Sequence, residues 1–259
     1  SVHEGSFLSP RGMVLMAGAD ELSLLAAFEE EFEGSGVAMR RIDRAGLLSH
    51  CDGLKPYWQY GIEQESCADI DVSSLHQAYL RVAKRSGVEL RCNAALVSAK
   101  HEAGLWRVET RAGEVDAGIL VNAGGAWADE VAIRAGIRPI GISPFRRTMV
   151  QLSFDRSVSH ALPLMMSARG DFYFKSDGAG GVWLSPHDEI PSAPTDAAPE
   201  EIDVAMAIDR FEQAVDWRIA RVTHKWAGLR SFAPDRLPVY GFDAARPSFF
   251  WFAGQGGFG

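Results

Sequence analysis

The stretch HKWAGLRSF places an arginine, Arg230, in an apolar neighbourhood, two residues from Gly228 and two from Phe232. If 222–232 is a strand, alternation puts Arg230 on the face that also carries Val222, His224 and Trp226. A buried guanidinium must be paired, and its planar fork suits a carboxylate or a phosphate. A ligand carboxylate and a structural salt bridge to a protein carboxylate such as Asp235 are both compatible with this spacing.

Two glycine-rich turns could bring backbone close to a ligand. In LVNAGGAW, Gly124 and Gly125 follow an apolar strand and open a helix, where free amides favour a phosphate. The alternative is a tight β–α turn without a ligand, and this motif taken by itself favours that alternative. The segment FAGQGGFG matches G-x-G-x-x-G through Gly254, Gly256 and Gly259, but no acidic ribose partner follows. We therefore interpret it as a loop at a strand end against which a flat ligand lies.

Two further polar side chains stand in apolar strands. Tyr173 alternates with Phe172 and Phe174, so it is either a surface tyrosine or a pocket hydroxyl. Arg147, in FRRTMVQLS, reads by default as an exposed strand charge. No Ser/His/Asp or Cys/His spacing is visible, so we predict neither a nucleophilic triad nor a metal site.

Composition excludes some classes of protein. The 259 residues are 47% hydrophobic, with a formal net charge of −8, which argues against a nucleic-acid partner. No apolar run reaches about 18 residues, so no transmembrane segment is expected. The cysteines Cys51, Cys67 and Cys92 show no metal or redox spacing, so we expect reduced, buried thiols and a cytoplasmic location.

The elements that must position these residues alternate in kind along the chain. Amphipathic helices are predicted over 18–36 and 69–87, with apolar residues at helical spacing and glycine stops. A strand, a glycine turn and a helix follow one another over 114–137, and another helix is predicted over 200–215. The predicted strands are 88–92, 96–100, 105–111, 147–154, 171–176, 180–186, 221–232 and 247–254. Helices and strands interleave first and strands predominate later, which predicts an α/β layer with a more antiparallel sheet.

Taken together, the motifs resemble a known family. The order of LVNAGGAW, WAGLR with PD and P, and GQGGFG is similar to that in FAD-dependent amine and amino-acid oxidoreductases of the D-amino-acid oxidase type. Within that superfamily, ADIDVSSLHQAYLR, PFRRT, HKWAGLRSF and FFWFAGQGGFG most resemble bacterial FAD-dependent D-arginine dehydrogenases. The resemblance covers nearly the whole chain and implies part of a FAD-binding Rossmann-like domain plus a mostly antiparallel substrate-binding domain.

The resemblance implies roles for single residues. Arg230 and Arg147 match arginines that grip the substrate's α-carboxylate, and Tyr173 matches a hydroxyl over the same group. Glu4 falls where the arginine-specific enzymes have a glutamate facing the substrate guanidinium, and Gly257 at a backbone position that contacts substrate. No protein side chain is implied as an acid or base. The implied contacts to non-covalent FAD are Leu96, Asn122, Ala123, Gly124, Gly125, Trp127, Gly254, Gln255, Gly256, Gly257, Phe258 and Gly259.

The implied reaction is oxidation of the Cα–N bond of a D-amino acid, with a basic, D-arginine-like side chain. Hydride passes from Cα to flavin N5, and the imino acid hydrolyses in water to a keto acid and ammonia. Oxygen or a quinone is the expected electron acceptor, and peripheral contact with the inner membrane is compatible with a quinone. The alternatives are an oxidase or dehydrogenase of glycine, sarcosine or D-proline, and a non-catalytic carboxylate-binding fragment.

Departures from the family pattern also carry expectations. The family's N-terminal βαβ unit, with its G-x-G-x-x-G, is absent from these residues, so we expect a piece of a longer flavoenzyme that holds FAD weakly or lacks it. The expected organisation is a connecting segment over 1–67, a FAD-binding portion over 68–142, a substrate-binding domain over 143–225, and a return to the FAD-binding domain over 226–259.

Overall fold

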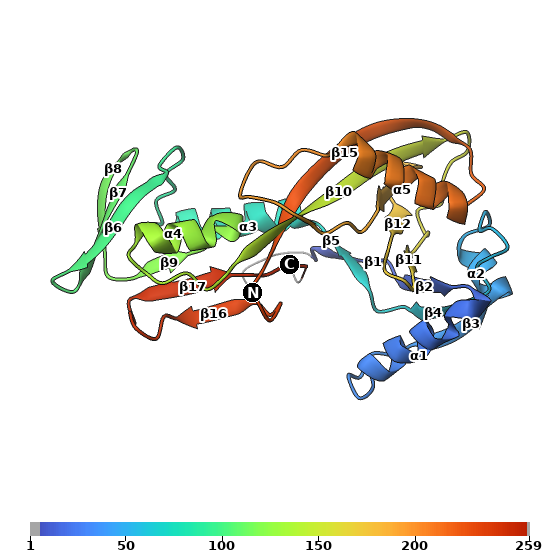
Figure 1. Ribbon diagram of the computed structural model, residues 1–259. Coiled ribbons are helices and arrows are strands. Elements are labelled where there is room, and N and C mark those ends of the chain that lie inside the picture. The colour runs from blue at the N-terminus through green and yellow to red at the C-terminus, as the bar shows by residue number, and fades with distance from the viewer. Residues whose placement is uncertain (1–5, 258–259) are drawn as a thin grey trace. The chain divides into compact units, whose positions relative to one another are not determined.

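The computed structural model describes residues 6–257, and the chain divides into two compact units built from separate segments (Figure 1). Unit 1 comprises residues up to 86, 148–188 and 198–227, and unit 2 comprises 87–147, 189–197 and the residues from 228 onward. The division falls inside two long strands, so that residues 143–147 of β10 and 228–232 of β15 belong to unit 2. Which unit binds FAD and which binds substrate remains a proposal.

Unit 1 is built on a mostly antiparallel sheet. Its strand order is β10-β13-β12-β11-β2-β4-β3, and β15 pairs with β10; β11 and β2 run parallel, while the pairs β10–β13, β13–β12, β12–β11, β2–β4 and β4–β3 are antiparallel. A separate antiparallel ribbon joins β1 and β5. The strands are β1 Leu8–Pro10, β2 Met13–Ala17, β3 Arg40–Asp43, β4 Tyr60–Gln64, β5 Ala68–Ile70, β10 Ser143–Phe154, β11 Leu164–Ser167, β12 Tyr173–Ser176, β13 Val182–Ser185 and β15 Ile219–Phe232.

The helices of unit 1 begin where the sequence supplies caps or a change of composition. Asp43 accepts a hydrogen bond from the Gly46 amide at the start of α2, and Asp71 accepts one from the Ser74 amide at the start of α3. Gly87, at φ +81°, follows the end of α3 in the left-handed conformation that glycine favours. The helices are η1 Ala19–Glu21, α1 Leu22–Glu31, α2 Arg44–His50, α3 Val72–Arg85 and α5 Glu201–Ala214.

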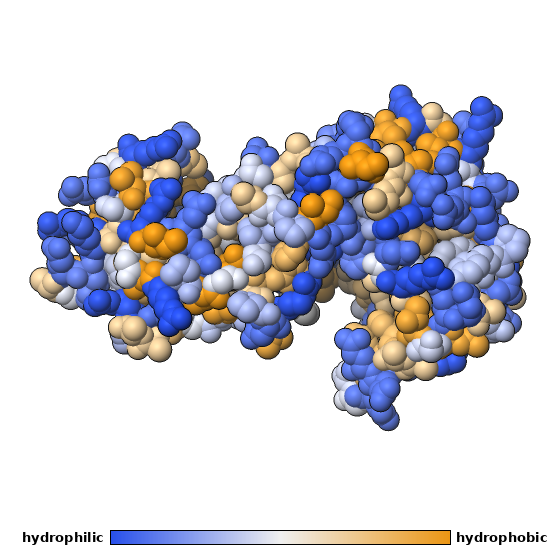
Figure 2. All heavy atoms as spheres, viewed as in Figure 1, coloured by the Kyte–Doolittle hydropathy of each residue, from blue (hydrophilic) through white to orange (hydrophobic). Residues whose placement is uncertain are grey.

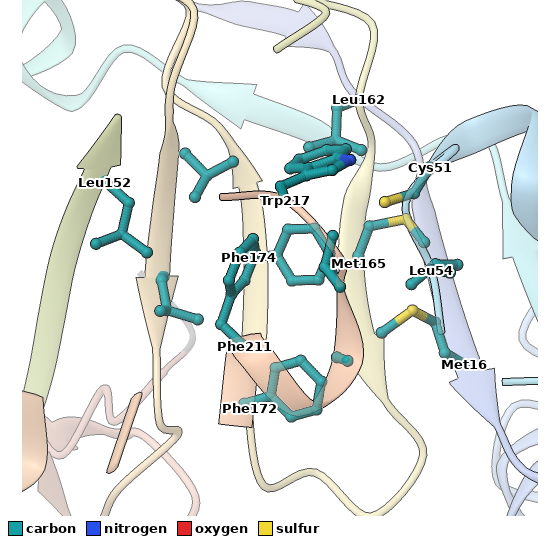
Figure 3. Packing of buried hydrophobic residues seen from close by; sticks show 14 of the residues in the cluster. Met16, Cys51, Leu54, Leu152, Leu162, Met165, Phe172, Phe174, Phe211 and Trp217 are labelled. Carbon is teal, nitrogen blue, oxygen red and sulfur yellow. The ribbon is translucent and has the colours of Figure 1, made fainter. Parts of the chain in front are cut away.

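The core of unit 1 is rich in aromatic and sulfur-containing side chains (Figure 3). Phe211 of α5 is fully buried, with its ring 5.1 Å from that of Phe174 and 5.4 Å from that of Phe154. Phe172, just before β12, and Phe174 of β12 enter this core while Tyr173 lies on the opposite face, as alternation predicts. Burial of such rings supplies the main stabilising free energy of this unit.

Unit 2 holds two small sheets and a short helix. One sheet is the antiparallel meander β6-β7-β8, and the other has the order β16-β17-β9, in which β17 and β9 are parallel. The buried Trp106 indole packs on Phe249 and donates a 2.9 Å hydrogen bond to the Ser248 carbonyl. The elements are β6 Leu96–Glu102, β7 Leu105–Thr110, β8 Gly113–Ala117, β9 Leu120–Asn122, η2 Gly125–Trp127, α4 Ala128–Arg134, β14 Ile190–Pro191, β16 Val239–Phe242 and β17 Phe249–Ala253.

The predicted mixed α/β fold with several sheets is confirmed, but four local expectations are wrong. Residues 88–92 form no strand. The apolar face predicted for α3 is not buried, since Tyr79 is 60% exposed and only Ala78 is fully buried. Along β15 both faces are exposed from 220 to 225, so the expected buried apolar face is confined to the strand's C-terminal end. Of the three unpaired cysteines only Cys51 is buried, and Cys92 is exposed.

The surface is largely hydrophilic with interspersed apolar residues, as the view in Figure 2 shows. Some of the exposed apolar residues of unit 1 lie on α5 and β15, among them Ile202, Met206 and Val222. Over residues 6–257, no helix is both long and apolar enough to cross a membrane.

Candidate active site

The Arg230 guanidinium is the clearest candidate for binding a ligand in unit 2. Arg230 is half-buried near the end of β15, and among residues 6–257 its side chain has neither a hydrogen bond nor an ion pair. Asp235, the alternative partner, is exposed and instead accepts a 3.0 Å hydrogen bond from the Leu237 amide. The structure thus offers this cation no counter-charge from the described protein, which leaves it able to pair with an anion from outside.

The glycine loop after β17 packs directly against the end of β15. Its Gly256 amide donates a 2.8 Å hydrogen bond to the Ser231 carbonyl, and Gly256 lies at φ +56°. A Cβ added at Gly256 would lie 2.3 Å from Cε1 of Phe232, and one added at Gly257 would lie 3.2 Å from Nη1 of Arg230. Absence of side chains therefore lets this loop reach both Phe232 and Arg230. The structure brings the predicted residues Arg230 and Gly257 together.

The second predicted arginine, Arg147, is buried and paired. Its side chain is only 5% exposed, so the default interpretation as an exposed strand charge is wrong. Nη2 of Arg147 lies 3.3 Å from Oε1 of Glu189. Glu189 also pairs with Arg236, whose Nη2 lies 2.9 Å from both carboxylate oxygens. All three residues belong to unit 2.

These two arginine sites are joined by a continuous series of contacts. The guanidinium carbon of Arg236 lies 3.9 Å from the centre of the Phe232 ring, which in turn borders Gly256. The same ring stands edge-on to Phe145, at 5.8 Å between centroids. Glu189, Arg236 and Phe232 were not singled out by sequence reasoning, and no short-range spacing connects a loop residue at 189 with a turn at 236.

Asp129 was also missed, although it fixes the start of the strand that carries Arg147. Its carboxylate accepts hydrogen bonds from the amides of Ile140, Gly141 and Ile142, at 3.1, 3.0 and 2.9 Å. These residues lead directly into β10 at Ser143. One helical carboxylate thus satisfies three loop amides that no helix or strand partner serves.

The NAGGAW turn is organised by Asn122, which is 1% exposed. Its Nδ2 donates to the Ala128 carbonyl at 2.8 Å, and its Oδ1 accepts from the Gly124 amide at 3.2 Å. Gly125 stands at φ +56°, and a Cβ added there would meet nothing within 4 Å. The helix that follows, α4, has only seven residues, so the turn offers open backbone rather than a helix-end anion site. Ala123 and Trp127 are exposed beside it.

The remaining predicted residues are less closely tied to this site. Tyr173 belongs to unit 1, where its hydroxyl lies 3.5 Å from the Met149 sulfur and its ring stands edge-on to His187. Leu96 is half-buried next to a register shift in β6, and its carbonyl accepts a hydrogen bond from Arg134. Gly254 and Gln255 lie within the loop after β17. Glu4, Phe258 and Gly259 lie outside the described residues.

Solved structures define the class of fold. Glycine oxidase from Geobacillus kaustophilus superposes with a TM-score of 0.82 at 18% identity, over 96% of this chain and 66% of that one. L-proline dehydrogenase from P. horikoshii gives 0.82 at 21% identity, over 96% and 68%. L-alpha-glycerophosphate oxidase from Mycoplasma pneumoniae, solved with FAD bound, gives 0.87 at 14% identity, over 98% and 70%. At these identities the likeness establishes a shared fold.

Sequence comparison then gives the family. Residues 4–259 match the DAO family of FAD dependent oxidoreductases, and the chain belongs to that family. Human mitochondrial dimethylglycine dehydrogenase is 25% identical over 201 residues, which are 70% of this chain and 23% of that enzyme. Hydrogen cyanide synthase subunit HcnC of Pseudomonas protegens is 23% identical over 219 residues, 78% of this chain and 48% of the subunit. The chain therefore spans less than half the length of these relatives. The closer resemblance to D-arginine dehydrogenases stays a proposal.

Proposed function

We propose that this chain forms part of a FAD-dependent oxidoreductase that oxidises the Cα–N bond of a D-amino acid. The observation that carries the proposal is the half-buried Arg230, which has no partner among residues 6–257 and adjoins a glycine loop. A guanidinium in such a position recognises a carboxylate by charge-assisted hydrogen bonds. Arg147, a buried residue of β10, would contribute positive charge to the same group.

The residues present fit a flat, phosphate-bearing cofactor. Gly125 offers backbone with open space around it, and Gly254 and Gly256 adopt left-handed conformations that leave the loop after β17 without side chains. These two glycine segments, with Asn122 organising one of them, would hold FAD. When bound, FAD supplies the acceptor for a hydride equivalent, that is, two electrons and one proton.

The chain's own residues then need only bind and orient. The two arginines would fix the carboxylate and thereby the Cα–H bond, while the amine must arrive neutral for its lone pair to assist hydride loss. The resulting imino acid leaves and takes up water to give a keto acid and ammonia. No protein base is assigned, and either oxygen or a quinone would reoxidise the reduced cofactor.

The proposed substrate is a basic D-amino acid. The sequence resemblance to D-arginine dehydrogenases, including Glu4, supports this choice, and the net charge of −8 favours cationic substrates. Glycine, sarcosine or proline is the second candidate, because the proteins of similar fold include glycine oxidase and L-proline dehydrogenase.

The test is a substrate panel on the protein expressed at its natural length and purified with FAD. We expect absorbance near 450 nm, turnover of D-arginine above that of glycine, sarcosine and proline, and loss of kcat/KM by about 10²–10³-fold in Arg230→Ala. Arg230→Lys, which keeps the charge without the fork, should lose less. An unchanged kcat/KM in Arg230→Ala would overturn the carboxylate role. A colourless protein that still binds carboxylates would favour a non-catalytic binding module.

A further inference from the structure

Unit 1 contains a cavity of about 260 Å³, the Trp58 cavity, whose polar side chains have no part in the proposed function. Its lining includes residues from three stretches of chain: Tyr57 and Trp58 before β4, Arg169 and Asp171 between β11 and β12, and Arg210 on α5. Sites for drug-sized ligands measure roughly 300–1,000 Å³. The Trp58 cavity is smaller and therefore suits a molecule smaller than those ligands.

Among the described residues, four charged side chains line this cavity, and two of them are without an ionic partner. Glu21 and Arg169 pair with each other. Within residues 6–257, however, the half-buried Asp171 carboxylate has no hydrogen bond or ion pair, and the half-buried Arg210 pairs with no carboxylate. Burial of a charge is costly unless a counter-charge compensates it. One ligand that carries both an anionic and a cationic group would compensate both side chains.

Arg210 uses only part of its guanidinium within the fold. Its Nη1 donates hydrogen bonds to the carbonyl oxygens of Asp171 and Pro186, the latter at 2.6 Å. Nε and Nη2 have no acceptor in the part of the chain that the structure describes. The N–H groups of Nε and Nη2 are parallel, so this edge of the guanidinium matches the two oxygens of a carboxylate. Because the Nη1 bonds already fix the group, a ligand carboxylate would meet a pre-oriented cation.

The indole of Trp58 supplies a third polar group without a partner. Trp58 is 6% exposed, and its Nε1–H has no acceptor among residues 6–257. The ring is packed against those of Tyr57 and Phe172, at 5.1 and 5.9 Å between centroids, which limits its freedom to turn. A buried Trp N–H usually has a hydrogen-bond acceptor, since leaving it without one costs free energy. A ligand oxygen in the cavity would supply that acceptor.

We propose that the Trp58 cavity binds a small zwitterion, a free α-amino acid whose carboxylate pairs with Arg210 and accepts the Trp58 Nε1–H, and whose ammonium group pairs with Asp171. None of these three residues is proposed to contact FAD or the substrate. The inference therefore goes beyond the proposed function and requires neither FAD nor turnover. An amino acid bound in this cavity stabilises unit 1 by an amount that grows with its concentration.

The experiment measures the binding of L-alanine by isothermal titration calorimetry to the protein expressed at its natural length and purified with FAD. All proteins carry Arg230→Ala, which removes the proposed substrate-carboxylate group. Propionate and ethylamine, each of which lacks one charge of alanine, are the ligand controls. Arg221→Met is the protein control, because Arg221 is an exposed arginine of unit 1 that does not line the cavity.

We expect L-alanine to bind with a Kd of about 1 mM or below, and propionate and ethylamine to bind at least about tenfold more weakly. Asp171→Asn and Arg210→Met should each raise the Kd of L-alanine at least about tenfold, since each removes a charge-assisted hydrogen bond. Trp58→Phe, which keeps an aromatic ring but lacks the N–H, should raise this Kd about fivefold. Arg221→Met should change it by less than about twofold.

Asp171→Asn separates a role in binding from a role in folding. Among residues 6–257 the wild-type carboxylate makes no hydrogen bond that the substitution could break. Without ligand, its urea denaturation midpoint should therefore equal that of the protein with Asp171. L-alanine at about ten times its Kd should raise the midpoint of the protein with Asp171 and leave that of Asp171→Asn unchanged. If Arg210→Met does not fold, Asp171→Asn by itself decides the test.

Three outcomes would overturn the inference. The first is no binding of L-alanine at about 10 mM, which would assign the cavity to ordered water only. The second is binding of propionate as tight as that of L-alanine, and the third is an unchanged Kd in Asp171→Asn. Failure of the proposed function is a different result, an unchanged kcat/KM in Arg230→Ala, and it would leave the binding of L-alanine to the Trp58 cavity as it is.

Discussion

Unit 1 and unit 2 both hold partly buried charged side chains, but Arg230 of unit 2 differs from those of unit 1 described next in its lack of a partner. In unit 1, Asp69 is shared by Arg11 and Lys175, the buried Glu21 is paired with Arg169, and the half-buried Arg44 and Arg210 donate hydrogen bonds to backbone carbonyls. In unit 2, Arg230 has no partner among the described residues. Matched charges stabilise or specify a fold, whereas an unmatched half-buried cation beside bare glycine backbone is a candidate recognition group. We propose on this ground that unit 2 contributes the group that recognises the ligand's carboxylate.

The largest expected effect breaks the core of unit 1. Replacing Phe211 with alanine removes a fully buried ring that packs on Phe154, Phe174 and Trp217, and should cost about 3–5 kcal/mol of unfolding free energy. Equilibrium denaturation in urea measures the loss. Phe211→Leu is the matched control and should cost less, because it leaves a smaller cavity. A loss below about 1 kcal/mol would contradict the assignment of stability to this core.

A second substitution probes the glycine loop of unit 2. Gly256→Ala places a Cβ 2.3 Å from Phe232 at a positive φ, so the loop or the ring must shift, at a cost of about 1–3 kcal/mol. We expect weaker FAD retention, followed by absorbance after gel filtration. Gly228→Ala is the control, since its Cβ would meet nothing within 4 Å. Equal FAD retention by the two variants would show that the loop's close approach is unimportant.

The matched charges of unit 1 predict a pH dependence. Burial raises the pKa of Asp69, but hydrogen bonds and charges from Arg11 and Lys175 outweigh burial and hold the pKa below its ordinary value of 3.8. The stabilisation is therefore present above the unfolded-state pKa and is lost as pH falls through the lower folded-state value. At pH 7, Asp69→Asn should lower the free energy of unfolding by about 2 kcal/mol relative to the wild type. Denaturation curves should show this difference between variant and wild type shrinking below pH 4. A difference that stays constant with pH would contradict the role of the Asp69 carboxylate.

The smallest expected effect is a difference in thiol reactivity between Cys51 of unit 1 and Cys92 of unit 2. Cys51 is 1% exposed, and this burial raises the pKa of its thiol to about 12. At pH 8 almost no Cys51 thiolate is therefore present to react. Cys92 of unit 2 is exposed. Iodoacetamide at pH 8 should modify Cys92 in the folded protein and Cys51 only after unfolding, as mass spectrometry of peptides would show. Early modification of Cys51 would mean that the core of unit 1 opens readily.

Local patterns were sufficient for much of the fold. Asp71 and Gly87 bracket a helix at the predicted place, and alternation around Tyr173 assigned the faces of β12 correctly. Local patterns failed to predict strands where strand formation depends on a neighbouring strand to pair with. VELRC has a strand's composition but forms no strand, whereas the segment Arg40–Asp43, which is polar except for the buried Ile42, forms β3 because β4 is available to pair with it.

The candidate site was only half accessible to sequence reasoning. Spacing singled out Arg230 but did not decide whether its partner is a ligand or Asp235, because sequence separation alone does not say where the Asp235 carboxylate points. The choice depends on the turn after β15, where Asp235 hydrogen-bonds the amide of Leu237. The link between Arg147, Glu189 and Arg236 joins residues far apart in sequence, and long-range pairing of loop side chains leaves no periodic signal.

The carboxylate of Asp129 has a consequence for the timescale on which unit 2 opens. The amides of Ile140, Gly141 and Ile142 lie outside any helix or strand, yet all three depend on this single acceptor group. In hydrogen exchange they should therefore gain and lose protection together, as one cooperative opening, rather than exchange at the independent rates of an ordinary loop. The segment that leads into β10, the strand that carries Arg147, is thus held by a single carboxylate and should open as one unit when that carboxylate releases it.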